Sequence, residues 1–311
     1  MRSFLTKRVL QAIGVIFCIS LITFLALNIV PGDPVRIMMG DMADEQTVAQ
    51  VRHMMGLDRP IPEQYTRWFT AMIQGDFGVS YAQKKPVVVL LGRAIAVTGT
   101  LAGGAYIFAL ICGITVGVLA AVFHGSLIDR GLMSLSILGI SAPSFWLAII
   151  LQIIFALTLK WFPLSGIKTP VSYVLPIIAL GVQYAASIAR VTRTAMMDVL
   201  NQDFMRTAHA KGLDPRVIIL GHGLRNALIP IITIAGTQLG NILTGSLLVE
   251  TVFSIPGMGK LLLDAIQARD LPLIEGGVMY IAFICVIMYV LVDVLYAMVD
   301  PRIRLGGEAS S

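Results

Sequence analysis

The side chains that could do chemistry in this sequence are few and lie far apart. Its cysteines and histidines show neither the short spacing of a zinc or redox site nor a pair of metal ligands at helical spacing. They are Cys18, Cys112, Cys285, His53, His124, His209 and His222. We therefore expect no metal site and no redox centre in this chain.

Motifs for hydrolysis and for nucleotide binding are missing as well. The sequence holds no Ser-His-Asp order of a hydrolase, no His-Glu-x-x-His zinc motif, and no glycine-rich loop ending in Gly-Lys-Ser/Thr. The chain is thus predicted not to be an enzyme and to carry no cofactor. Any chemical energy that its function uses must come from another polypeptide.

Two acidic residues accompany apolar stretches, where ionisable groups are costly and invite functional interpretations. Asp293 precedes Asp300 by seven residues, which places it about 10 Å from that end of a helix. A structural role is favoured there over a proton relay. Glu250 comes just before a Phe-Ser-Ile-Pro-Gly turn. It would lie at the mouth of a path and meet a cationic group of a solute, or it would anchor the outer loop.

The composition shows which environment these residues need. Of 311 residues, 57% are hydrophobic and 13% charged, against about 25% charged in a soluble domain. The mean hydropathy is +0.84, so the surrounding solvent must be largely lipid. The formal net charge of +5 does not indicate nucleic-acid binding, because the basic residues form no aromatic-studded stripe.

Six apolar runs of about 20 residues predict transmembrane helices, because backbone polar groups in a bilayer must be satisfied within their own segment. The first exceeds the roughly 7–15-residue core of a signal peptide and lacks a small-residue cleavage site, so we expect it to be retained. The fold class is therefore all-α and polytopic, with helices expected at about 9–30, 97–123, 132–159, 174–188, 229–253 and 277–299.

Basic residues predict the orientation of these spans. The segment 31–93 is too long to follow the positive-inside rule. Without it, twelve Lys and Arg lie on the side of the two termini and four on the other side. Both termini are therefore expected in the cytoplasm, with the spans in an inner, or plasma, membrane.

The segment 31–93 reads as a small helical insertion on the outer face. Turn signals bracket two stretches, 45–55 and 63–73, that have the pattern of short amphipathic helices. We expect four parts in the chain: 1–30 with the first helix, the insertion 31–93, a core at 94–299, and a cytoplasmic tail at 300–311.

Pairs of glycines four residues apart predict close contacts between helices, where lipid supplies no hydrophobic drive for association. Ordinary packing is favoured over a role in lining a path. The pairs are Gly99 and Gly103, Gly113 and Gly117, and Gly236 and Gly240.

The most informative stretch is the cytoplasmic loop 190–230. Within it, a short helix from about residue 203 to 211 is predicted to end at Gly212, a residue suited to a positive φ. Asp214 and Pro215 then suit the N-cap and first position of the next helix. The small and basic residues at this corner fit the docking surface of a partner protein. They equally fit an interfacial helix held by anionic lipid through residues such as Arg193 and Arg216.

Resemblance to a known family favours the first alternative. The run RTAHAKGL at 206–213, followed by LRNALIP at 224–230, resembles the EAA loop of binding-protein-dependent ABC permeases, and in particular the first-type permease of the peptide/nickel importer class. Further motifs occur in that family's order along nearly the whole chain: PGDP at 31–34, GLDRP at 56–60, QGDFG at 74–78, SAPSF at 141–145, ETVFSIPG at 250–257 and DPRIR at 300–304. Arg206 stands where the wider superfamily has Glu, and Leu224-Arg225 replaces its Leu-Pro, so a salt bridge based on that Glu is not carried over.

The resemblance implies an ATP-driven importer. This chain would pair with a homologous second permease in the lipid bilayer and with two cytoplasmic ATPases that bind ATP and Mg. An extracytoplasmic binding protein would deliver the solute, either a di- or oligopeptide or, alternatively, glutathione or a nickel or other metal chelate. The coupling helix that docks on an ATPase would be formed by Arg206, Thr207, Ala208, His209, Ala210, Lys211, Gly212 and Leu213.

Two other functional classes fit the sequence less well. A secondary transporter driven by an ion gradient would need inverted repeats, interrupted helices and ionisable residues near the midplane. An intramembrane enzyme would need catalytic polar residues at depth. Neither pattern is visible in the sequence.

Overall fold

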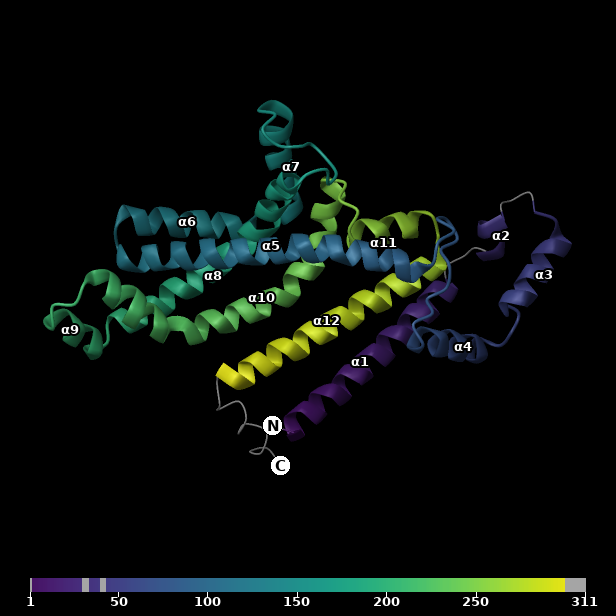
Figure 1. The fold of residues 1–311 in the computed structure, drawn as a ribbon, viewed down its shortest axis with the longest axis horizontal. Coiled ribbons are helices and arrows are strands. Elements are labelled where there is room, and N and C mark those ends of the chain that lie inside the picture. Colours follow the sequence, from purple (N-terminus) through teal and green to yellow (C-terminus); the bar gives the residue numbers. More distant parts are fainter. Residues whose placement is uncertain (1, 30–33, 40–42, 300–311) are drawn as a thin grey trace. The chain divides into compact units, whose positions relative to one another are not determined.

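The computed structural model describes residues 2–29, 34–39 and 43–299 (Figure 1). Over these residues the predicted all-α class is confirmed: the described chain contains no strand, and its isolated backbone bridge joins Val79 and Pro86. The helices are α1 (Arg2–Ile29), α2 (Pro34–Met39), α3 (Glu45–Met55), α4 (Ile61–Ile73), α5 (Val87–Val122), α6 (Leu127–Ser141), α7 (Ser144–Leu151), η1 (Gln152–Thr158), η2 (Pro170–Tyr173), α8 (Val174–Leu200), α9 (Asp203–Ala210), η3 (Val217–Leu224), α10 (Arg225–Val252), α11 (Met258–Gln267) and α12 (Leu271–Val299).

Within the described residues, five helical stretches are long and apolar enough to cross a membrane, and a bent pair makes a sixth candidate. This agrees with the six predicted spans. The five stretches are Arg8–Ile29, Val87–Val122, Pro170–Leu200, Val217–Ile242 and Leu271–Val290.

The third predicted span, 132–159, is not one continuous helix, and that expectation is wrong. Its two halves, α6 and the α7–η1 stretch, meet at an angle of 106°. The break lies at Ala142, whose φ of −79° and ψ of 124° are extended. Pro143 causes this conformation, because the proline ring clashes with a helical preceding residue.

The chain forms two compact units, each with its own packed core. The first comprises residues 1–97 and 257–290, and the second comprises 98–256 and 291–311. The boundaries predicted at residues 30, 93 and 299 remain predictions.

In the first unit, an aromatic cluster holds α4 against α1. Tyr65 of α4 lies between Phe17 and Phe24 of α1, with ring centroids 6.5 and 5.4 Å away, and its hydroxyl is 2.9 Å from that of Ser20. Phe17 is twelve residues from Ile29, or about 18 Å along the helix. The contact therefore covers an apolar length of α1 and is not confined to its C-terminal end. Helices α3 and α4 confirm the helical pattern predicted for the insertion.

A buried carboxylate fixes the chain entry into α12 in the same unit. Asp270 is fully buried and accepts hydrogen bonds from the Ser80 hydroxyl and from the backbone N–H groups of Tyr81 and Ala82, the latter two at 3.0 Å. Burial, reinforced by the nearby carboxylates of Glu275 and Asp270, raises the pKa of Tyr81 to about 12. The phenol is therefore neutral at any physiological pH.

In the second unit, α8 is the central helix and contacts α6, α7 and α10 (Figure 1). Gly113 and Gly117 of α5 face it so closely that a Cβ atom would lie 2.7 Å from the Ala185 carbonyl oxygen and 2.6 Å from that of Ala189, respectively. The close contact predicted from this glycine pair is confirmed. Within the described chain no such contact is present at Gly99 and Gly103, where a Cβ atom would meet open space.

Candidate functional site

The corner predicted in the 190–230 loop is present in the second unit. Helix α9 spans Asp203–Ala210 and ends as the N–H groups of Lys211 and Gly212 donate to the carbonyls of Thr207 and His209. Gly212 has a φ of +71°, which confirms the predicted left-handed conformation that L side chains rarely adopt.

The next helix begins as its sequence predicts. The Asp214 carboxylate accepts a hydrogen bond of 2.7 Å from the Arg216 N–H, and the Asp214 carbonyl accepts one of 3.0 Å from Ile218. Pro215 has no backbone N–H, and the first position of a helix has no intrahelical acceptor for one. The helix then continues through the wider π-helical turns of η3 into α10. The result is a tight corner between two helices, as the sequence indicates.

Helix α9 has one buried and one exposed face. Met205 and Ala208 are 1% and 7% exposed and pack into a cluster with residues such as Met196, Ile218 and Ala227 of the neighbouring helices. The expectation that Ala208 lies on the exposed corner is therefore wrong. Its small side chain serves the packing of α9 onto its own chain, since residues three apart share a helix face.

The exposed face carries the other residues of the predicted coupling helix. Its members are Arg206, Thr207, His209, Ala210, Lys211, Gly212 and Leu213, joined by Phe204, of which 39% is exposed. This face combines small, basic and apolar side chains, and it is available to another protein or to lipid. The docking of a partner protein on this face of α9 stays a prediction, as does the binding of lipid.

An ion pair that sequence reasoning missed joins α8 to the first turn of α6. The Arg193 guanidinium donates to both oxygens of the Asp129 carboxylate, at 2.6 and 2.7 Å, and only 5% of the Asp129 side chain is exposed. The Gly125 N–H donates to the same carboxylate at 3.0 Å, and His124 Nδ1 lies 3.3 Å from it. A local signal was available: Ser126 accepts a hydrogen bond from the Asp129 N–H at the start of α6, the pattern of a capping box.

This pair bears on the lipid-anchor alternative for the loop. Arg193 is one of the basic residues that would bind anionic lipid, yet two of its guanidinium nitrogens are already bonded to Asp129. Its role in the described structure is to hold two helices together. Arg216 remains exposed.

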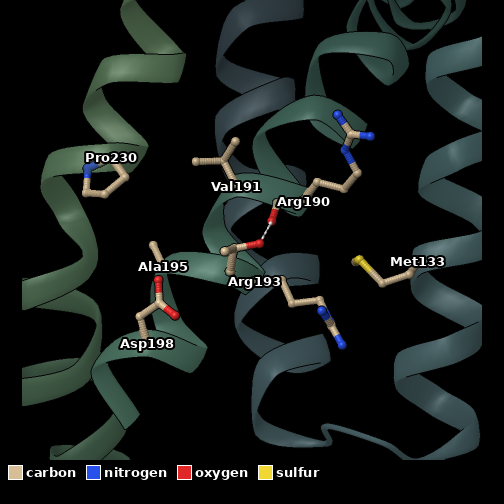
Figure 2. A pocket seen from close by; sticks show the side chains of 8 residues that line it. Met133, Arg190, Val191, Arg193, Ala195, Asp198 and Pro230 are labelled. Carbon is tan, nitrogen blue, oxygen red and sulfur yellow. Dashed lines mark hydrogen bonds between the residues drawn. The ribbon is translucent and has the colours of Figure 1, made fainter. Parts of the chain in front are cut away.

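Between α6 and α10, the open face of α8 forms a groove of about 560 Å³ (Figure 2). Its lining brings Met133 of α6 and Pro230 of α10 to the two flanks of α8, with charged and apolar side chains between them. The residues of α8 in this lining are Arg190, Val191, Arg193, Thr194, Ala195 and Asp198.

Glu250 lies in α10 and is fully buried. Its carboxylate accepts a hydrogen bond of 2.7 Å from the Thr98 hydroxyl, which is also buried, and its carbonyl accepts one of 2.8 Å from the Ile255 N–H in the following turn. This environment favours the anchoring role over contact with a solute. The side chain of Asp293 lies outside the described residues.

No group of three or more potential metal ligands is found within the described part of the chain. The geometry of the second unit thus offers an exposed face on α9, a charged groove on α8 and closely packed helices.

Comparison with known families decides the class. Residues 113–305 match the family model of the binding-protein-dependent transport system inner membrane component, and residues 1–102 match the N-terminal model of the same kind of component. The chain belongs to this family. It is a permease of a binding-protein-dependent ABC importer, and the ATPase of such a system is a different polypeptide.

Relatives match the permease over its whole length. A glutathione transport system permease protein of Salmonella paratyphi A is 40% identical over 304 residues, covering 98% of this chain and 99% of the relative. A Brucella abortus protein named for a peptide transport system is 39% identical over 312 residues, with the same coverage. The solved inward-facing structure of the MetNI methionine ABC transporter is similar in fold, with a TM-score of 0.54, 19% identity, and coverage of 68% of this chain and 96% of that one.

The Asp129–Arg193 pair predicts a large loss of stability when one partner is removed. Asp129→Ala leaves a largely buried guanidinium without its carboxylate and should destabilise the purified permease by about 3 kcal/mol. The thermal midpoint of unfolding in detergent measures this loss. Adding Arg193→Ala should cost less than the sum of the single changes, since the partners form one network.

The control is Asp203→Ala, which breaks an exposed contact 3.7 Å from Arg206. Exposed pairs contribute about 0–1 kcal/mol, so this variant should unfold close to the wild-type temperature. Equal midpoints for Asp129→Ala and Asp203→Ala would show that the buried pair does not hold the helices together.

Proposed function

We propose that this permease forms half of the translocation path of an importer for short peptides, with glutathione as the second candidate solute. The observation that carries the proposal is full-length similarity at about 40% identity to proteins named for glutathione and peptide transport. Glutathione is itself a tripeptide with one γ-linkage, so the two candidates share free amino and carboxyl groups. The other half of the path is a second, homologous permease.

Two ATPase subunits that bind ATP and Mg supply the energy, and an extracytoplasmic protein delivers the solute. The absence of a phosphate-cradling motif from the sequence supports this division of labour. The exposed face of α9 is the docking surface for one ATPase. Its anchoring through Met205 and Ala208 supports this role, because a helix packed firmly onto its own chain transmits a push instead of yielding to it.

Both termini and α9 lie in the cytoplasm, and the 31–93 segment lies on the outer face. The excess of basic residues on the side of the termini supports this orientation. The groove on α8 then lies toward the cytoplasmic end of the path, since Arg190 is ten residues, about 15 Å, from the end of the helix at Leu200.

The proposed function predicts ATP-driven accumulation of peptide. The permease, reconstituted in liposomes with the second permease and the ATPases, should import radiolabelled dialanine or trialanine when the binding protein is outside and ATP inside. Vanadate should abolish the uptake, and competition with glutathione should identify the preferred solute. Robust uptake by the permease alone from a proton gradient would establish a secondary transporter in place of an importer subunit.

The exposed face of α9 predicts a selective loss of ATPase binding. Ala210→Trp adds bulk to this face without entering the chain's own core, so the variant should reach the membrane in normal amounts, lose most ATPase on purification and lose uptake. The matched control is Ala82→Trp, the same change at an exposed residue of the predicted outer segment. If both variants retain the ATPase equally, or if Arg216→Ala does the damage instead, α9 is a lipid anchor and not a coupling helix.

The orientation predicts opposite labelling of two single cysteines. In a variant without Cys18, Cys112 and Cys285, an impermeant maleimide applied to intact spheroplasts should label Gln83→Cys and spare Ser310→Cys. Gln83 suits the test because it is exposed, whereas the neighbouring Ser80 is buried against Asp270. The reverse pattern would place both termini outside.

A further inference from the structure

The groove on α8 contains two charged groups that the helix packing does not use. The Arg193 guanidinium is bonded to Asp129, and the Thr194 hydroxyl donates to the Arg190 carbonyl at 3.2 Å. Within the described residues, the Arg190 guanidinium and the Asp198 carboxylate have no ion-pair partner. The groove therefore offers one positive and one negative group to whatever enters it.

The spacing of these two groups restricts the occupant. Arg190 and Asp198 are eight residues apart on α8, about 12 Å along the helix axis. Figure 2 shows the Arg190 side chain extending toward the α6 side of α8, whereas Val191, Ala195 and Asp198 lie on the side that faces α10. A simple anion would leave the Asp198 carboxylate unbalanced, and a simple cation would leave Arg190 unbalanced. The complement is a molecule with a carboxylate and an ammonium group held apart by a short chain.

A peptide of two to four residues meets this requirement, because its extended backbone spans roughly 7–14 Å. The volume of about 560 Å³ is within the roughly 300–1,000 Å³ typical of small-ligand sites. We infer that the groove is a subsite for zwitterionic short peptides, in which the Arg190 guanidinium binds the peptide carboxylate and the Asp198 carboxylate binds its ammonium group. Arginine suits the first role, because its planar guanidinium binds a carboxylate through two parallel hydrogen bonds.

This inference rests on the proposed function, since a peptide subsite serves only a permease that moves peptides. The same pair of charges occurs, closer together, in a phosphatidylethanolamine headgroup. The spacing along the helix favours the peptide, because Arg190 and Asp198 lie about two turns of α8 apart.

The subsite is tested by protection of a cysteine placed inside it. Thr194 is exposed between Arg190 and Asp198, so Thr194→Cys, in the variant lacking the three native cysteines, reports on access to the groove through its rate of maleimide labelling. The full-length permease is purified in detergent free of phosphatidylethanolamine and is titrated with trialanine. We expect labelling to slow as the groove fills, with weaker protection by N-acetyl-trialanine and by trialanine amide, each of which lacks one charge.

Variants assign each end of the peptide. Arg190→Gln should raise the trialanine concentration needed for half protection about tenfold, and Asp198→Asn should do likewise, because each removes one charge-assisted contact. In Arg190→Gln, trialanine and its amide should become nearly equivalent, since the residue that recognises the carboxylate is gone. The matched control is Arg130→Gln, which removes an exposed arginine of α6 outside the groove. In this variant, trialanine should protect the introduced cysteine at the same concentration as in the parent protein.

Each outcome decides the inference. Absent protection, or protection that is equal for the three peptides and unaffected by Arg190→Gln, overturns it. So does protection by phosphatidylethanolamine in nanodiscs that trialanine does not relieve, which would make the groove a lipid site. ATP-driven peptide uptake without protection refutes the subsite and leaves the proposed function intact, whereas protection without such uptake refutes the function and leaves the subsite.

Discussion

The contact between Arg193 and Asp129 is the interaction on which the second unit most depends. A buried carboxylate is tolerated only when it is paired and hydrogen-bonded, and here a bidentate guanidinium and a backbone N–H satisfy it. Either charge, if it were buried without the other, would destabilise the fold. The pair therefore holds the first turn of α6 against α8. Because α8 carries the groove and leads directly into α9, this contact also helps to position both.

The same principle recurs at the other buried acids. Asp270 holds the 80–82 turn in the first unit, and Glu250 accepts from Thr98 in the second. Each carboxylate is satisfied by donors from a distant part of its own unit. In a chain with so little charge, these acids serve as fixed points between helices whose apolar surfaces, facing lipid, would provide little preference for one register over another.

The packing of α9 against neighbouring helices of its own chain makes the corner rigid. A helix of eight residues is marginal in isolation, because nucleation costs more than so few hydrogen bonds return. Met205 and Ala208 compensate by burial against α8, η3 and α10. The exposed residues of α9 are thereby presented on a rigid support, as the proposed coupling role requires. The groove lies on α8, which directly precedes α9 in the chain, so a push on α9 would be passed through α8 to the proposed peptide subsite.

The sequence by itself determined the features that depend on neighbouring residues. Composition and run length predicted an all-α membrane protein with six spans, and Gly212, Asp214 and Pro215 predicted the corner after α9, because a left-handed residue and a helix cap are local properties. The motif order predicted the family. Only the tertiary structure showed that Ala208 faces inward, that the third span is bent by 106°, and that Arg193 meets an aspartate 64 residues away. These outcomes depend on which helix lies beside which, and the spacing of residues along one helix carries no record of its neighbour.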